Sequence, residues 1–150
     1  MEQYKTRFGA DEYELRFAKG LSELPEAAAI RRDVFIAEQG FENEFDDTDE
    51  TAYHCLVIRG GIPIATGRLY GTGSEAHIGR IAVVRSERGK GIGSFLMSEI
   101  EKYAARLGFT RTALAAQCRA KEFYAANGYV PAGDVFYDEH CSHIMMYKQL

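Results

Sequence analysis

The sequence predicts one α/β (α+β) domain over residues 1–150, with a mixed, largely antiparallel sheet of about six to seven strands and helices on both faces. Two observations carry this prediction. Three strand-like runs follow one another with only glycine-rich turns between them, which is typical of an antiparallel meander. A long amphipathic helix then lies between two apolar runs, an order that favours a parallel crossover.

The first part of the chain predicts a strand and a helix. Residues 12–18, EYELRFA, are typical of a short strand. Ser22 is the expected N-cap of the following helix, and Pro25 suits its first turn. Gly40 is expected to end this helix, whose apolar face is formed at helical spacing by Ala27, Ile30, Val34 and Ala37.

An acidic segment follows, with six acidic residues among the nine of positions 42–50. The plain interpretation is a solvated loop. The alternative is that its charge draws cationic amines toward a cleft.

The middle of the chain gives the clearest elements. Strands are expected at 53–59, 63–70 and 77–84, and Gly60-Gly61 is a strong hairpin signal between the first two. A continuous apolar stripe from Ile92 to Leu107 predicts a long amphipathic helix that Gly108 would cap.

The last third continues the alternation of strands and helices. Residues 110–116 predict a buried strand. A shorter helix carries Phe123 and Tyr124 and is expected to stop at Gly128. The final strands are expected at 129–130 and 143–147.

Composition narrows the class of protein. With 46% hydrophobic and 27% charged residues, the chain is typical of a globular protein, and its net charge of −4 argues against nucleic acid as a partner. No apolar run approaches the roughly 20 residues that span a membrane, and the first residues lack a signal-peptide pattern. Three cysteines without paired spacing predict free thiols in a reduced, cytoplasmic protein.

The most informative segment is His77–Ser94, HIGRIAVVRSERGKGIGS, where an apolar strand runs through a basic, glycine-rich turn into the long helix. The first N–H groups of a helix lack internal partners and, with the helix dipole, favour an anion. Glycines let a pyrophosphate approach the backbone. The mononucleotide P-loop spacing is absent, and Ser94 replaces the third glycine of a dinucleotide fingerprint. A turn that only joins strand to helix is the remaining alternative.

Two distant motifs resemble the GNAT family of N-acetyltransferases. Residues 88–93, RGKGIG, match its R/Q-x-x-G-x-G/A motif, and Ile81-Ala82-Val83 before them matches its cofactor strand. Residues 120–129, AKEFYAANGY, match its A-x-x-F-Y-x-x-x-G-F pattern. Residues 31–40, RRDVFIAEQG, and the terminal His143-Ile144-x-Met146 are similar to a small, bacterial, single-domain subgroup. Acyl-homoserine-lactone synthases share the fold and a similar Val-Phe-x-x-Glu start.

The resemblance implies acetyl-coenzyme A as co-substrate. The backbone of Ile81, Ala82 and Val83 would pair with its pantetheine arm. Gln117 stands where many members have asparagine, and as a longer amide it keeps the same donor and acceptor types. The pyrophosphate would be held by backbone amides in the turn and first helical residues, namely Arg88, Gly89, Lys90, Gly91, Ile92, Gly93 and Ser94.

Acetyl transfer to an amine needs an acid for the departing thiolate and a neutral amine. Tyr124 matches the family's general acid, although its position on an amphipathic helix also suits a core aromatic. No carboxylate lies on the predicted strand at 77–84, where many members have the base. Glu38 is therefore the candidate base, with a solvated helix-end charge and a water relay as the alternatives.

Several further positions are candidates for binding the acceptor, a metal or an acyl group. Arg80 is a cation in an apolar strand, so it would bind an acceptor carboxylate or pair with a structural acid. Glu38 and His143 are further acceptor-binding candidates. Metal is not expected, because His140, Cys141 and His143 fit no structural zinc spacing. Cys118 could be an acyl-accepting nucleophile, but direct transfer makes that step unnecessary.

The predicted function is acetyl transfer from acetyl-coenzyme A to a primary amine of a small molecule or peptide by direct attack on the thioester. The alternatives are an acyl-homoserine-lactone synthase and a non-catalytic acyl-coenzyme A sensor. The partners expected are this amine, with no nucleic acid and no membrane, and the resemblance leaves room for a homodimer.

Overall fold

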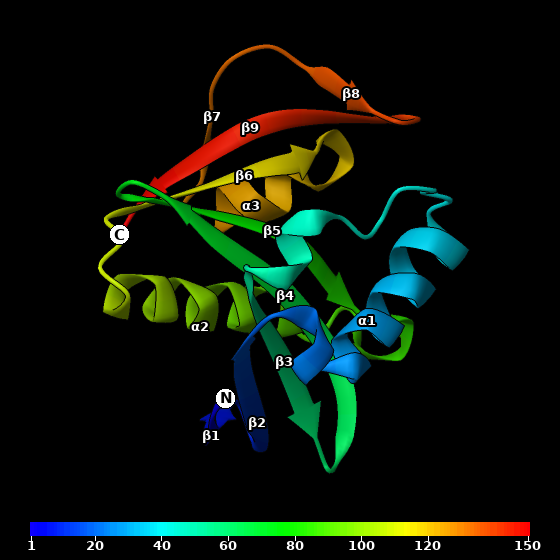
Figure 1. Cartoon of the computed structure of the whole chain (residues 1–150), viewed down its shortest axis with the longest axis vertical. Coiled ribbons are helices and arrows are strands. Elements are labelled where there is room, and N and C mark those ends of the chain that lie inside the picture. Colours follow the sequence, from blue (N-terminus) through cyan, green and yellow to red (C-terminus); the bar gives the residue numbers. More distant parts are fainter.

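A single nine-stranded sheet forms the centre of the protein in a computed structural model that describes residues 1–150 (Figure 1). Its strand order is β1-β2-β3-β4-β5-β6-β9-β7, and β8 also pairs with β9. The strands are β1 (Glu2–Phe8), β2 (Asp11–Lys19), β3 (Tyr53–Arg59), β4 (Ile62–Thr72), β5 (Glu75–Val83), β6 (Arg111–Gln117), β7 (Val130–Pro131), β8 (Phe136–Asp138) and β9 (Cys141–Gln149).

The predicted meander and crossover are confirmed. The pairs from β1 to β5 are antiparallel, and β5 and β6 are parallel, joined through α2 (Ile92–Arg106). The count of six to seven strands was too low, because β1 and β8 were not predicted. Both are sheet-edge strands without a continuous apolar run: β1 largely alternates exposed and half-buried residues, and the three residues of β8 are all exposed.

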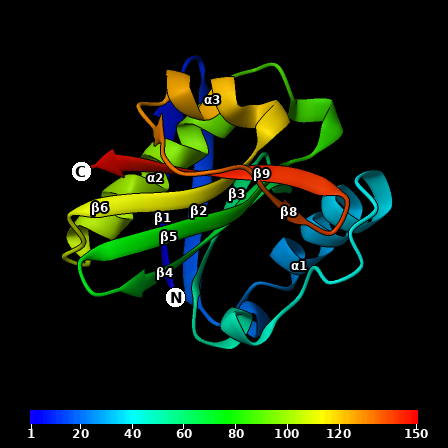
Figure 2. The same ribbon diagram turned by 90° about the horizontal axis from the view of Figure 1, so that it is seen from above.

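Helices cover both faces of the sheet, as predicted (Figure 2). The helix α2 and the short α3 (Lys121–Ala126) lie on one face, where Leu96 and Ile100 pack with Val57 in the larger core cluster. The helix α1 (Pro25–Arg31) lies on the other, where Ile30 packs in a cluster with Leu56. Successive residues of β3 thus pack in opposite cores, which explains why residues 55–58 of this strand are an unbroken apolar run.

The first helical segment departs from the prediction in two details. Ser22 is not its N-cap, because it lies in a separate 3-10 turn, η1 (Leu21–Glu23), while Pro25 does occupy the first helical turn. The segment continues as a π-helix, η2 (Arg32–Glu38). A π-turn takes an extra residue per turn, so Phe35 is buried and Ala37, predicted to be on the apolar face, is exposed.

Glycines end or begin the other helices as predicted. Gly91 precedes α2 with a left-handed φ of 82°, and Gly108 follows it with a φ of 97°. Gly128, after α3, has a φ of 95°. None of the helices is long and apolar enough to cross a membrane.

Candidate active site

A cleft of about 930 Å³ opens where β5 and β6 part. The two strands are paired only from Glu75↔Arg111 to His77↔Ala113. Beyond His77, the edge of β5 that faces β6 has no strand partner, so its backbone groups face the cleft. The cleft is lined by most of the predicted site residues, namely Glu38, Arg80, Ile81, Ala82, Val83, Arg88, Gly89, Gly91, Ile92, Gly93, Ser94, Gln117, Tyr124 and His143.

One end of the cleft is the glycine-rich turn. Here the first amides of α2 are open to a ligand, because a helix has no acceptors for them. Gly93 is closely packed, since a Cβ there would lie 3.0 Å from Cζ of Phe123 on α3 and would push that ring aside. Asn127 donates to the Ser94 hydroxyl at 3.1 Å and ties α3 to the same turn. Lys90 does not line the cleft: its Nζ lies 3.0 Å from the Glu87 carboxylate.

Glu38 lies at this same end. Its two carboxylate oxygens accept hydrogen bonds from Nη1 and Nη2 of Arg88, both at 2.9 Å, and Arg85 lies 3.4 Å away. The hydrogen bonds from Arg88 are the main cause that lowers the pKa of the Glu38 carboxyl below its ordinary value. A carboxylate held in this way has little tendency to accept a proton, and it engages the Arg88 guanidinium beside the glycine-rich turn.

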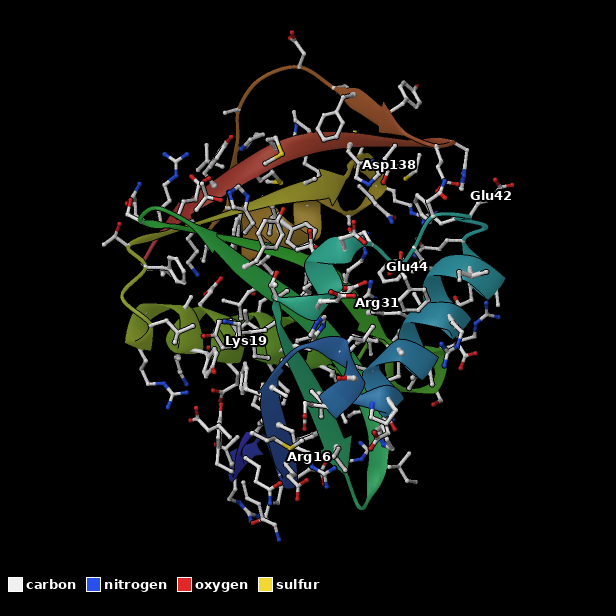
Figure 3. All side chains as sticks on the ribbon, in the orientation of Figure 1. Arg16, Lys19, Arg31, Glu42, Glu44 and Asp138 are labelled. Carbon is white, nitrogen blue, oxygen red and sulfur yellow. The ribbon has the colours of Figure 1, made fainter.

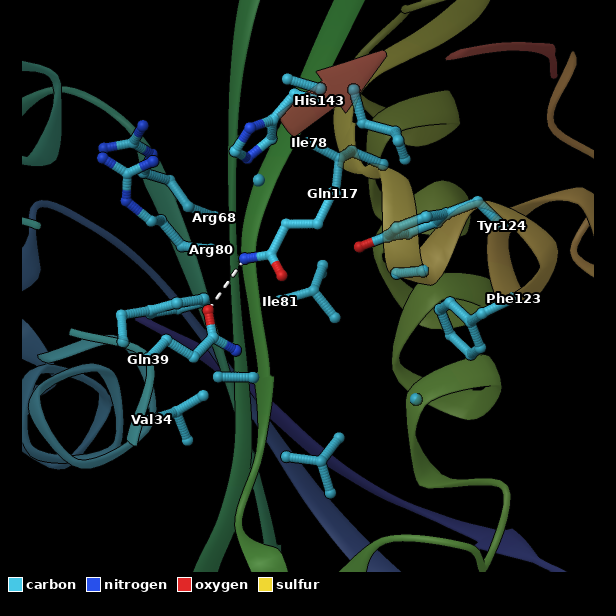
Figure 4. A pocket seen from close by; sticks show the side chains of 18 of the residues that line it. Val34, Gln39, Arg68, Ile78, Arg80, Ile81, Gln117, Phe123, Tyr124 and His143 are labelled. Carbon is cyan, nitrogen blue, oxygen red and sulfur yellow. Dashed lines mark hydrogen bonds between the residues drawn. The ribbon is translucent and has the colours of Figure 1, made fainter. Parts of the chain in front are cut away.

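Two amide side chains meet across the middle of the cleft (Figure 4). Gln117, at the end of β6, donates from Nε2 to Oε1 of Gln39 at 2.8 Å, and Arg119 donates to the Gln117 Oε1 at 2.8 Å. Gln39 was not predicted as a site residue. Its position directly after Glu38, in the segment that resembles the bacterial subgroup, was the only signal in the sequence.

Tyr124 points its hydroxyl into the cleft from α3 (Figure 4). Its ring packs edge-on against Phe123 and Tyr129, with centroids 5.0 and 6.1 Å away. Burial raises the pKa of Tyr124 to about 12, so the hydroxyl stays protonated at neutral pH. Its ring packs against the larger core cluster, as a core aromatic would, while its hydroxyl faces the cleft; the acid role stays a prediction.

Arg80 lies where β5 bulges beside the cleft. Gly79 and Ala82 of β5 are three residues apart, but their partners on β4 are only two residues apart, so β5 contains one extra residue here. Arg80 takes a left-handed φ of 54° in this bulge. Its Nε lies 3.0 Å from Oε2 of Glu44, and its guanidinium also donates to the Glu44 carbonyl at 3.0 Å. The structure therefore shows the pairing with an acid that the sequence left as one of two interpretations.

Glu44 belongs to an arginine–carboxylate cluster, in which Arg31, Arg68, Glu44 and Asp49 are buried, Arg80 is half-buried and Asp46 is exposed. Arg31 is 1% exposed and donates to Glu44 at 2.9 Å and to Asp49 at 2.8 Å (Figure 3). Burial acts to raise the pKa of Asp49, but hydrogen bonds led by those of Arg31 outweigh it and lower this pKa to about 2. For Glu44, burial outweighs the arginines and raises the pKa. The prediction of a solvated loop was therefore wrong for part of the acidic segment. Glu44, Asp46 and Asp49 bind the arginines of the cluster and fix the segment to α1 and the sheet.

The histidine and cysteine candidates do not converge on one another. His143 lines the cleft and bonds the Cys141 carbonyl through Nδ1 at 2.9 Å. All three cysteines are free, as predicted, and Cys118 is half-buried. No group of three or more histidine, cysteine, aspartate or glutamate side chains converges as metal ligands do.

Comparisons with known proteins agree with this geometry. The model of the GNAT acetyltransferase domain matches residues 22–150. The uncharacterized N-acetyltransferase YjcF of Bacillus subtilis is 34% identical over 134 residues, which are 87% of this chain and 96% of YjcF. An acyl-CoA N-acyltransferase from Pseudomonas aeruginosa has the same fold with a TM-score of 0.81 and 27% identity, covering 91% of this chain and 99% of that one.

The fold is also shared with an enzyme of the alternative class. The CoA-dependent acyl-homoserine lactone synthase BjaI superposes with a TM-score of 0.75, covering 90% of this chain and 82% of BjaI, at 16% identity. This likeness concerns the fold alone.

Proposed function

This chain belongs to the GNAT family of acetyltransferases, and from this premise we propose that it transfers an acetyl group from acetyl-coenzyme A to a primary amine. The observation that carries the proposal is the continuous cleft that runs from the amides at the start of α2, along the unpaired edge of β5, to the Tyr124 hydroxyl. Each stretch offers the chemistry that one part of acetyl-coenzyme A needs.

The chain's own groups would divide the work along this cleft. The backbone amides from Gly89 to Ser94 would hold the pyrophosphate, whereas the Arg88 amide already donates to the Arg85 carbonyl. The edge of β5 at Ile81–Val83 that has no strand partner would bind the amides of the pantetheine arm, which would replace the hydrogen bond from Arg88 Nε to the Val83 carbonyl. The Tyr124 hydroxyl would donate its proton to the sulfur as the thioester bond breaks. The acceptor would enter from the side of Arg80 and His143, a small molecule or peptide whose amine attacks the carbonyl carbon directly.

Binding of acetyl-coenzyme A should raise the melting temperature of the protein. A ligand at 100 times its dissociation constant adds about 2.7 kcal/mol to the free energy of unfolding. The variant Gly91→Val should lose this shift, because Gly91 has a left-handed φ of 82° and a Cβ there would lie 3.1 Å from Phe8. Thermal unfolding with and without millimolar acetyl-coenzyme A measures both.

The matched control is Gly73→Val. Gly73 also has a positive φ, of 62°, but it has open space around it and lies outside the cleft. This variant should lose some stability and keep the full shift. A folded wild-type protein that shows no shift with acetyl-coenzyme A would remove the proposed function.

The role of Glu38 can be separated by kinetics. Glu38 engages the Arg88 guanidinium, and Glu38→Gln should release it toward the pyrophosphate of acetyl-coenzyme A. We therefore expect the KM for acetyl-coenzyme A to fall up to about fivefold, with kcat little changed. This size corresponds to the contribution of an exposed ion pair, up to about 1 kcal/mol. Initial rates at varied acetyl-coenzyme A test this, with Glu42→Gln as an exposed control. A large fall in kcat with loss of the acidic limb of the pH–rate profile would instead establish Glu38 as the base.

A further inference from the structure

We propose that His143 is the general base that takes a proton from the acceptor amine, an inference that rests on the proposed function. The reaction needs a base because an alkylamine is protonated at neutral pH and only its neutral form attacks a thioester. Glu38 is bound by Arg88, and Glu44 is bound by Arg31 and Arg80. The imidazole of His143, in contrast, has one ring nitrogen without a hydrogen-bond partner in the chain.

The hydrogen bond at Nδ1 determines which ring nitrogen has the free lone pair. The partner of Nδ1 is the backbone carbonyl of Cys141, at 2.9 Å, and a carbonyl oxygen can only accept. Nδ1 must therefore carry the proton, and in the neutral ring Nε2 has a free lone pair. No group of the chain donates a hydrogen bond to Nε2.

The ring is also fixed in place. His143 lies on β9 between Gln117 of β6 and Phe136 of β8, is 7% exposed, and stacks on the Phe136 ring with centroids 5.8 Å apart. Figure 4 shows it projecting into the cleft from the strand above Gln117. Outside the glycine-rich turn and the residues that contact it, the charged and titratable groups that line the cleft are Glu44 in the acidic segment, Arg68 and Tyr70 on β4, His77 and Arg80 on β5, Arg119 just after β6, Tyr124 on α3, and Asp138 on β8.

The proton and bond changes balance with these groups. The acceptor ammonium gives one proton to Nε2 of His143, and the neutral amine nitrogen forms a bond to the thioester carbon. The carbon–sulfur bond then breaks, and the sulfur leaves with the proton of the Tyr124 hydroxyl. The second amine proton passes to the resulting phenolate, which restores Tyr124, and His143 releases its proton to water.

Two substitutions at His143 test the assignment. In His143→Asn the amide nitrogen can keep the hydrogen bond to the Cys141 carbonyl, while Nε2 is deleted. In His143→Gln an amide nitrogen stands near the place of Nε2 and cannot act as a base. The wild-type protein is first assayed with spermidine, tryptamine, glutamate and a lysine-containing peptide to find an amine that it acetylates. For that amine, we expect both variants to lower kcat/KM at least about 100-fold. Both should also lose the acidic limb of the pH–rate profile, and keep the thermal shift with acetyl-coenzyme A.

The matched control is His77→Asn, at the other histidine of the cleft, whose ring lies 3.2 Å from Glu75. This variant should keep the acidic limb. The inference is overturned if the limb persists in the His143 variants or disappears in His77→Asn. It is also overturned if nitrogen NMR finds the neutral His143 ring protonated at Nε2. A wild-type protein that binds acetyl-coenzyme A and acetylates none of the four amines overturns the proposed function as well.

Discussion

Replacing Tyr124 with phenylalanine should lower turnover about 100- to 10,000-fold, the usual contribution of a general acid. This corresponds to about 3–5 kcal/mol in the activation barrier. The substitution keeps the ring, and therefore the packing against Phe123 and Tyr129, and removes only the hydroxyl that points into the cleft. That hydroxyl has no hydrogen-bond partner in the chain, so stability should change little. Steady-state rates of coenzyme A release with an accepted amine, together with thermal unfolding, measure both effects.

The control for Tyr124→Phe is Tyr129→Phe. The Tyr129 hydroxyl is buried and bonds Thr112 and Glu101, each at 2.8 Å, so its loss should cost about 1–3 kcal/mol of stability and leave turnover nearly unchanged. The deficit of Tyr124→Phe should be smaller with a thioester whose thiol is more acidic, because that leaving group needs its proton less. A deficit independent of the leaving group would assign positioning, rather than proton donation, to Tyr124.

The fold was largely predictable because its signals are local. Glycine turns separate β3, β4 and β5, and the apolar stripe of α2 has one clear period. The failures have equally physical reasons. The three residues of β8 form a strand only because β9 supplies their partners, so no pattern of their own marks them. The π-turn of η2 changes the period within one helix, which a search at α-helical spacing cannot detect.

The two ends of the candidate site also differed in how far the sequence could predict them. The end proposed to bind the cofactor could be located in the sequence because residues 77–94 contain the strand, the turn and the start of α2 in one continuous stretch. The end proposed to bind the acceptor is assembled from distant segments: Gln39 meets Gln117 across 78 residues, and Arg80 meets Glu44 across 36. Composition identified the acidic segment but not which of its carboxylates are buried, since that depends on arginines contributed by α1, β4 and β5.

The arginine–carboxylate cluster gives the largest stability effect that we expect. Arg31→Met keeps a side chain of similar length and removes the charge between Glu44 and Asp49. Leaving buried carboxylates without their partner typically costs 3–5 kcal/mol, so we expect the free energy of unfolding at neutral pH to fall by about that amount. The control is Arg32→Met at the adjacent exposed position, which should change stability by less than about 0.5 kcal/mol.

The pH dependence of the Arg31→Met effect distinguishes lost charge from lost packing. Asp49 has a folded-state pKa of about 2, below the ordinary value near 3.8, so its ionised form stabilises the fold above about pH 4 and this contribution is lost as the pH falls toward 2. Without Arg31 the lowering of this pKa should be weaker. The difference in unfolding free energy between wild type and Arg31→Met should therefore narrow as the pH falls through this window. A difference that stays constant from pH 7 to pH 2 would mean that Arg31 stabilises the protein by packing alone, and that the acidic segment is not held to the sheet by charge.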